Sequence, residues 1–253
     1  MPIDTHQFKR DGFLVLPRVV PRWEFTSIRR RIEKSLDPLA GPVEYEADVA
    51  YRGAPKNKQS PGGSTPRRLL QALDRNLGLH SLVFNPAIVT AMRKLLQDDR
   101  IAVSQAHHNC VMTKFPGFSS DTDWHRDYRY WAFEKPRLIS AWFALQDESY
   151  ENGSLELIPG SHNLRINENR FDEYQFLRDQ EQQNRQLIGG SLRTHLRAGD
   201  VLLFDCQLLH SAQRNRTEQV KISPVFTFHP ADNHPIPGTR SAALPSIPCK
   251  DLF

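Results

Sequence analysis

The stretch Asp123-Trp124-His125-Arg126-Asp127-Tyr128 decides which fold and chemistry this chain can have. In an extended strand, side chains two positions apart project from the same face, so His125 and Asp127 would point at one spot. Far downstream, the apolar stretch 199–210 ends in a second histidine, His210. A His-x-Asp triplet alone is weak evidence for a metal, but two histidines and one carboxylate on one face of an octahedral ion leave three positions open, as in non-haem Fe(II) oxygenases. We therefore predict an iron site.

The composition predicts a soluble globular protein. At 253 residues the chain suits one domain with a substantial core. The 39% of hydrophobic and 25% of charged residues argue against wholesale disorder. A net charge of +4 and a pI near 9.0 are mildly basic. Such a charge fits an anionic small substrate or a phosphate-bearing surface, and by itself it does not indicate nucleic acid.

The cysteines and the N-terminal region indicate the cellular compartment in which the protein works. Cys110, Cys206 and Cys249 are odd in number and widely spaced, and they form neither a zinc pattern nor a disulfide framework. This usage favours a reducing compartment. The apolar run 13–16 is too short for the core of a signal peptide or for a membrane span. We therefore expect a cytoplasmic protein.

Helical patterns come first along the chain, and short strands follow. In the first part, periodicity and breaker residues predict a strand at 13–16, a helix at 23–36, a strand at 43–50, a long loop at 52–66, a helix at 66–73 and a helix at 81–97. From residue 101 on, two-residue alternation predicts strands at 101–113, 121–128, 137–146, 154–158, 192–196, 200–205 and 219–228, with a polar, helix-like insert at about 163–190. A loop as long as 52–66 is typical of a binding loop or a lid.

This order of elements predicts a mainly β (α+β) fold. The expected architecture is a double-stranded β-helix, or jelly-roll barrel, buttressed by N-terminal helices. We expect a single domain over 1–253. Residues 1–100 would supply the helical support and the binding loop, 101–230 the jelly-roll core, and 231–253 a C-terminal extension.

An Fe(II) oxygenase of this type also needs a place for its co-substrate, 2-oxoglutarate, which chelates iron by one end and leaves a second carboxylate inside the barrel. An unpaired buried charge is very costly, so a cation and hydrogen-bond donors must meet that carboxylate. Strand parity selects side chains that share an inward face. They are Lys221, Ser223 and Thr227 in 219–228, and Gln105 and Asn109 in 101–113. Alternatively, these polar residues form hydrogen bonds with one another inside the barrel and do not bind a co-substrate.

Several further motifs accompany the His-x-Asp stretch. They are Glu-Asn-Gly-Ser-Leu at 151–155, Ile-Pro-Gly-Ser-His at 158–162, and Gly199-Asp200 leading to His210. Together they resemble the phytanoyl-CoA dioxygenase family of Fe(II)/2-oxoglutarate oxygenases, over most of the chain from Arg10 to about Phe228. The resemblance implies that O2 is the oxidant, that iron(II) is held by His125, Asp127 and His210, and that 2-oxoglutarate is held with the help of Trp142, Gln105 and Asn109.

Two positions depart from the family pattern. Relatives usually carry an arginine eleven residues after the distal histidine, where this chain has Lys221, a point charge without a bidentate fork. Arg214 and Arg216 are the fallback anchors. Relatives often have glutamine where this chain has Arg126, whose side chain we expect to point away from iron. Halogenases of the superfamily lack the acid, so Asp127 favours hydroxylation or a related oxidation.

Residues at the pocket mouth are expected to bind the substrate. They are Arg67, Arg68, Tyr128, Arg129, Trp131 and Arg240. Their positive charge suggests an anionic substrate. Segments 44–47, 65–70 and 238–245 resemble bacterial Kdo (3-deoxy-octulosonate) hydroxylases of lipopolysaccharide. That resemblance implies a sugar acid on a glycolipid and peripheral contact with the inner membrane.

Two other classes of function stay open. The barrel could be a metal-binding module without oxygenase activity, which would bind metal but form no succinate. A nucleic-acid binder is the weaker alternative, because basic and aromatic residues interleave only at 128–131. We therefore expect no nucleic-acid partner. The residues do not indicate an oligomeric state.

Overall fold

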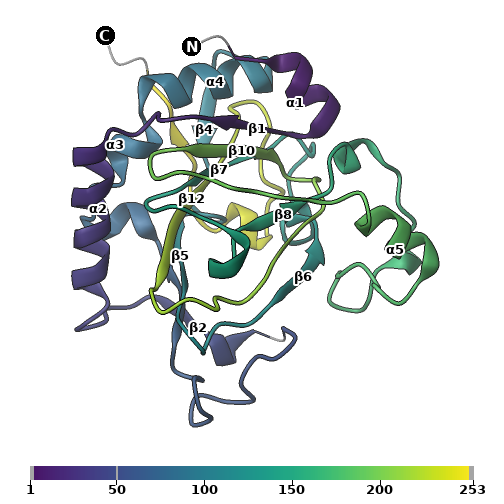
Figure 1. Cartoon of the computed structure of the whole chain (residues 1–253). Coiled ribbons are helices and arrows are strands. Elements are labelled where there is room, and N and C mark those ends of the chain that lie inside the picture. The colour runs from purple at the N-terminus through teal and green to yellow at the C-terminus, as the bar shows by residue number, and fades with distance from the viewer. Residues whose placement is uncertain (1–2, 50, 251–253) are drawn as a thin grey trace.

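The computed structural model describes residues 3–49 and 51–250, in which two antiparallel sheets pack together (Figure 1). The larger sheet has nine strands in the order β1-β10-β7-β12-β5-β3-β2, with β4 paired to β12 and β13 paired to β4. The smaller sheet has four strands in the order β6-β11-β8-β9. The strands of the larger sheet are β1 (Phe13–Leu16), β2 (Val43–Tyr45), β3 (Pro66–Leu70), β4 (Ile101–Val103), β5 (Cys110–Lys114), β7 (Ile139–Phe143), β10 (Val201–Asp205), β12 (Lys221–Pro230) and β13 (Ile247–Pro248). Those of the smaller sheet are β6 (Thr122–His125), β8 (Leu155–Leu157), β9 (Leu192–Arg193) and β11 (His210–Ala212).

The N-terminal helices gather on one side of the larger sheet, and α5 lies apart from them (Figure 1). The helices are α1 (Thr5–Asp11), α2 (Arg22–Ser35), α3 (His80–Val83), α4 (Pro86–Leu96) and α5 (Gln182–Ile188). The expected helix at 81–97 is divided because Asn85 caps α4 by accepting a hydrogen bond from the amide of Ala87, and Pro86 occupies the first helical position. The jelly-roll barrel with helical support is confirmed.

Alternation along the strands separates two apolar cores. On β12, Ile222 and Phe226 join α2, α4 and the outer faces of β7 and β10. Val225 of the same strand packs between the sheets with Trp142 and Phe204. The face that carries Val225 therefore points into the barrel, as the parity of 219–228 predicts.

The alternation predicted through 101–113 is wrong. The segment 104–109 forms bends and separates β4 from β5, so the two-residue pattern does not run through it. On β5, Cys110 and Met112 pack between the sheets, whereas Val111 joins the outer core. The inward face of β5 therefore carries the even-numbered residues, and Lys114 shares that parity.

The helix expected at 66–73 is also wrong. Residues 66–70 form β3, which pairs with β2 and β5. The apolar pair Leu69 and Leu70 suits either structure locally, and the ladders with two neighbouring strands decide for the sheet. The strand expected at 43–50 ends at Tyr45 and continues as a 3-10 helix over Glu46–Asp48. Residue 50 lies outside the described residues, as do 251–253 of the expected C-terminal extension.

Two irregular segments, which begin near Tyr51 and within 163–190, contact each other. The loop expected at 52–66 is irregular until Pro66, as predicted, and the insert at 163–190 is helical only in α5 and one 3-10 turn. Tyr51 contacts Phe176 edge-on at 5.3 Å between ring centroids. Arg52 forms an ion pair with Asp179 at 2.9 Å.

No helix among the described residues is long and apolar enough to span a bilayer.

Candidate metal centre

Three buried side chains converge at the end of the smaller sheet. His210 of β11 pairs in register with His125 of β6, which brings their rings to 4.3 Å between centroids. Asp127 follows at the start of a 3-10 helix, and its Oδ1 lies 3.8 Å from His125 Nε2 and 3.6 Å from His210 Nε2. Ligand atoms of all three residues lie within 4.8 Å of one another. This cluster has the donor set and spacing of a two-histidine, one-carboxylate site.

Backbone carbonyls orient both imidazoles. His125 Nδ1 bonds to the carbonyl of Asp123 at 2.8 Å, and His210 Nδ1 bonds to the carbonyl of Leu208 at 2.9 Å. Because a carbonyl only accepts, each Nδ1 carries the proton and each Nε2 presents its lone pair to the centre. Burial, followed by the charge of His210, holds the pKa of His125 well below its ordinary value. The imidazole of His125 is therefore neutral, as metal binding requires.

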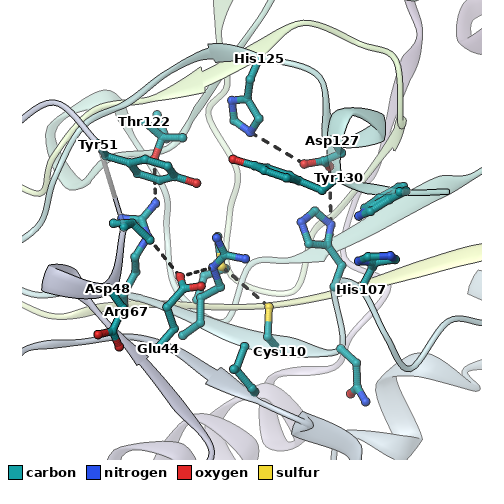
Figure 2. Close-up of a pocket in the computed structure, with 18 of the residues that line it drawn as sticks. Glu44, Asp48, Tyr51, Arg67, His107, Cys110, Thr122, His125, Asp127 and Tyr130 are labelled. Carbon is teal, nitrogen blue, oxygen red and sulfur yellow. Dashed lines mark hydrogen bonds and ion pairs between the residues drawn. The ribbon is translucent and has the colours of Figure 1, made fainter. Parts of the chain in front are cut away.

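A cavity of about 670 Å³ opens onto this cluster. Figure 2 shows His125 and Asp127 on one side of it, Glu44 and Arg67 on the other, and the rings of Tyr51 and Tyr130 between them. The volume lies in the range of pockets that hold small ligands, about 300–1,000 Å³. The cavity can therefore take a co-substrate at the metal together with a small substrate.

Lys221 lies in this cavity wall and is held by a partner that the sequence does not reveal. Its Nζ donates to Glu148 Oε2 at 3.0 Å. The same carboxylate accepts from the hydroxyl of Ser223 at 2.7 Å and from the indole N–H of Trp142 at 3.1 Å. Burial lowers the pKa of Lys221, and the charge of Glu148 raises it. The hydroxyl of Ser223 therefore donates to Glu148, and Ser223 does not line the cavity as a second donor for the co-substrate.

Lys114 is a second buried lysine in the cavity wall, and the alternation predicted through 101–113 did not identify it. Its Nζ donates to the carbonyls of Ser120, Ala212 and Gln213 at 3.2, 3.5 and 2.5 Å. Within residues 3–49 and 51–250 it forms no ion pair with a carboxylate, and burial holds its pKa well below the ordinary value. The available signal was a lysine at the end of a strand that begins with the apolar run Cys-Val-Met at 110–112.

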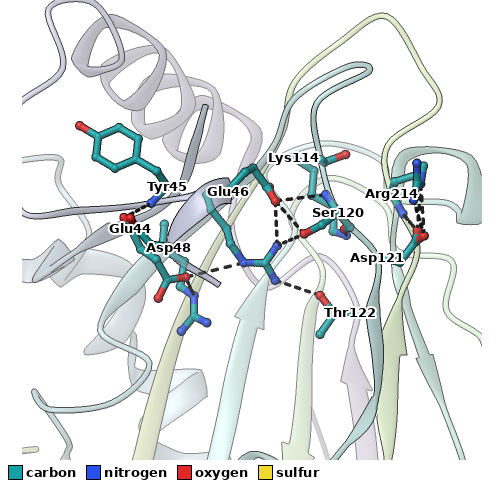
Figure 3. Close-up of polar contacts among 12 residues, drawn as sticks. Glu44, Tyr45, Glu46, Asp48, Lys114, Ser120, Asp121, Thr122 and Arg214 are labelled. Atoms are coloured by element: carbon teal, nitrogen blue, oxygen red, sulfur yellow. Dashed lines mark hydrogen bonds and ion pairs between the residues drawn. The ribbon is translucent and has the colours of Figure 1, made fainter. Parts of the chain in front are cut away.

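Arg67 belongs to a buried polar network that ties β3 to the 3-10 helix at 46–48 and to β6. Its guanidinium donates to Ser120 Oγ at 3.0 Å and to Thr122 Oγ1 at 2.9 Å, and it lies 3.5 Å from Glu46 Oε2. Figure 3 shows Glu46, Ser120 and Thr122 close to one another. Glu46 is fully buried. The arginine borders the cavity, but these bonds indicate a structural role more than the predicted contact with substrate.

Arg67→Ala is therefore expected to lower the free energy of unfolding by about 3–5 kcal/mol, because it leaves the carboxylate of Glu46 buried without its cation. Urea unfolding at equilibrium measures the loss. Arg193→Ala removes an exposed arginine that lies 3.8 Å from Glu156 and should change stability by no more than about 0.5 kcal/mol. Equal stability of the two variants would contradict the structural role of Arg67.

Arg68 differs from its neighbour because part of its guanidinium remains available. Its Nε lies 2.8 Å from Glu44 Oε1, and its side chain lines the cavity. No described residue accepts a hydrogen bond from its Nη atoms. The surrounding wall includes the rings of Tyr51, Tyr130 and Trp131. Arg68 is thus a fixed cation inside an aromatic-walled cavity.

The other predicted residues fall into two groups. Gln105, Asn109, Trp131, Trp142 and Arg240 line the cavity, although Gln105 donates to the carbonyl of Pro245 and Asn109 accepts from the amide of Leu73. Ser223, Thr227, Tyr128, Arg129, Arg214 and Arg216 do not line it. Their side chains bond or pack elsewhere: Tyr128 to the carbonyl of Phe133, Arg129 over the ring of Phe176, Arg214 to Asp121 and Thr227 to Ser140. Tyr128 was expected at the pocket mouth because it directly follows the metal-binding stretch, but the strand ends at His125 and the chain turns into a 3-10 helix there.

Several known proteins resemble this chain in sequence or in structure. The ectoine dioxygenase of Bordetella bronchiseptica is 27% identical over 247 residues, which cover 90% of this chain and 75% of that protein. The L-proline trans-4-hydroxylase of Streptomyces griseoviridis is 23% identical over 269 residues, which cover 95% and 90% of the two chains. The crystal structure of EctD from S. alaskensis with 2-oxoglutarate and 5-hydroxyectoine has a TM-score of 0.70 at 22% identity and covers 92% of this chain and 77% of its own. The structural likeness supports the fold.

The family comparison covers most of the chain. The family described as phytanoyl-CoA dioxygenase (PhyH) matches residues 8–223, which include His125, Asp127, His210 and Lys221. The chain therefore belongs to the phytanoyl-CoA dioxygenase family of Fe(II)- and 2-oxoglutarate-dependent dioxygenases.

Proposed function

We propose that this dioxygenase hydroxylates a small molecule that carries a carboxylate, with Fe(II) held by His125, Asp127 and His210. The observation that carries the proposal is Arg68, a fixed cation in the cavity wall with unengaged Nη atoms. A planar guanidinium binds a carboxylate through two parallel hydrogen bonds. The relatives' names, ectoine dioxygenase and L-proline trans-4-hydroxylase, also describe enzymes of small molecules.

The residues around the cluster fit iron and 2-oxoglutarate. The neutral imidazoles and the carboxylate suit Fe(II). When bound, Fe(II) with 2-oxoglutarate supplies the activation of O2, and the co-substrate leaves as succinate and CO2. We infer that the far carboxylate of 2-oxoglutarate is held by Lys221, with Lys114 near it, because both side chains line the cavity and Lys114 has no carboxylate partner among the described residues. The rings of Tyr51, Tyr130 and Trp131 would exclude water above the reacting carbon.

The finer predictions about the substrate receive less support. The relatives' names give no support to Kdo, to a glycolipid or to contact with a membrane. The cavity is partly enclosed by the contact between Tyr51 and Phe176, which favours a compact molecule over a lipid-linked sugar. Free carboxylated small molecules, including cyclic amino acids and sugar acids, are the first candidates.

The test is a screen of such molecules for formation of succinate coupled to a hydroxylated product. With the substrate found, Arg68→Gln should raise KM by about 10- to 100-fold, because a hydrogen bond between charged groups is worth about 1.5–3 kcal/mol. Turnover of 2-oxoglutarate without substrate should stay near that of the parent. Arg216→Gln, outside the cavity, is the matched control.

An unchanged KM in Arg68→Gln would show that Arg68 does not bind the carboxylate of the substrate. A metal-binding module without oxygenase activity would take up Fe(II) and form no succinate under any condition of the screen.

A further inference from the structure

His108 occupies an uncommon backbone conformation beside the metal cluster. Its φ is +38°, in a region that residues with a Cβ adopt rarely and that is often found at functional sites. The side chain lines the cavity. Trp131 meets its ring edge-on, at 5.1 Å between centroids and an interplanar angle of 89°. The ring is therefore held in one orientation.

The two carboxylate oxygens of Asp127 have different surroundings. Oδ1 faces the Nε2 atoms of His125 and His210. Oδ2 is buried and has no hydrogen-bond partner of standard geometry among the described residues. The nitrogen that approaches it is His108 Nδ1, at 3.5 Å. A buried acceptor without a donor is costly, so a partner for Oδ2 is expected.

The surroundings of His108 Nδ1 indicate where its proton lies. The same nitrogen is 3.2 Å from the hydroxyl oxygen of Ser140, which in turn is 3.2 Å from that of Thr227. The carboxylate of Asp127 has no hydrogen to give. Ser140 can donate to Thr227 and accept from His108. The Nδ1-protonated tautomer therefore presents one hydrogen to the two oxygens that face this nitrogen.

We propose that His108 is a positioning residue that donates its Nδ1–H to Oδ2 of Asp127 and so reserves Oδ1 for the metal. With Oδ2 engaged by this donor, Asp127 would offer a single oxygen to a bound metal and would leave other positions on it open. The contact is longer than an ideal hydrogen bond, as is common in active sites before the ligands are bound. The inference rests on the proposed metal site.

Titration of the metal-free protein with Co(II), followed by its visible absorption, tests the role. His108→Gly accepts the backbone conformation but removes the donor. It should bind Co(II) about 10- to 100-fold more weakly, as is typical when a partner of a ligand is lost, and its spectrum should change because the carboxylate is free to turn. His108→Asn keeps an N–H near the position of Nδ1 and tolerates positive φ, so it should stay within about threefold of the parent.

Two controls separate this proposal from the metal site itself. His229→Asn alters another buried histidine, which bonds to Ser246 outside the cavity, and should leave Co(II) affinity unchanged. Asp127→Ala should abolish Co(II) binding. If Asp127→Ala binds like the parent, the metal site is wrong. If only His108→Gly binds like the parent, with an unchanged spectrum, the role of His108 is refuted.

A measurement without substitution covers the case in which His108→Gly does not fold. Long-range 1H–15N correlation spectra of the Zn(II)-loaded protein report which nitrogen of each histidine carries hydrogen. His108 is expected as the Nδ1-protonated tautomer. The Nε2-protonated tautomer would overturn the proposal, because Nδ1 would then have no hydrogen to give to Asp127.

Discussion

His210→Ala is expected to abolish iron-dependent conversion of 2-oxoglutarate to succinate and to leave the fold intact. The imidazole supplies one of three protein ligands, and its Nδ1 bond to the carbonyl of Leu208 aims Nε2 at the centre. Iron affinity should fall by more than about 100-fold, since loss of a mere partner of a ligand already costs about 10- to 100-fold. Anaerobic titration with Fe(II) and a succinate assay measure the two effects.

The control for His210→Ala is His195→Ala, which removes an exposed imidazole. Circular dichroism establishes that both variants are folded. Full turnover of 2-oxoglutarate in folded His210→Ala would exclude this residue as a ligand. Weak turnover that excess Fe(II) restores would still agree with the assignment.

Lys221→Ala is expected to have two separate effects. Removing the ammonium leaves Glu148 buried without its cation, so the free energy of unfolding should fall by about 3–5 kcal/mol. Binding of 2-oxoglutarate should weaken by about 10- to 100-fold, because the far carboxylate loses a charged hydrogen bond worth about 1.5–3 kcal/mol. Urea unfolding and anaerobic titration of the Fe(II)-loaded protein measure the two quantities.

The double variant Lys221→Met/Glu148→Gln separates folding from binding. It removes the cation together with the buried anion, so stability should recover by most of the loss, while 2-oxoglutarate binding stays weak. If the double variant binds 2-oxoglutarate as tightly as the parent does, Lys221 does not hold the far carboxylate. Lys114→Met would then be the next test, and Arg214, which is paired with Asp121 outside the cavity, would not.

The same pair predicts a pH dependence. Burial places the pKa of Lys221 below its ordinary value in the free protein, and Glu148 opposes this shift. A carboxylate binds the ammonium form, so the contribution of Lys221 to 2-oxoglutarate affinity should be fully present below its lowered pKa and be lost as pH rises through it. In Glu148→Gln the fall should occur at a lower pH, because the group that raises this pKa is gone. A profile identical to that of the parent would contradict the coupling.

The sequence alone determined the class of fold and the residues of the metal cluster. Apolar alternation specifies which side of each strand is buried, so the barrel and the inward face of 219–228 could be predicted from local pattern. Two histidines and an acid at the ends of apolar strands that lie far apart in the chain indicate a metal site more readily than a structural role. This combination of periodicity and residue chemistry selected His125, Asp127 and His210.

Only the tertiary structure decided which polar groups meet inside the barrel. The break at 104–109 reversed the parity on β5 and turned Lys114 inward, and pairing with two neighbouring strands made 66–70 a strand. Glu148 reaches Lys221, and His108 reaches Asp127, from segments whose local pattern shows no such contact. Periodicity specifies the face on which a side chain lies, whereas its partner depends on strand order, register and chain breaks set by the packing of the whole molecule.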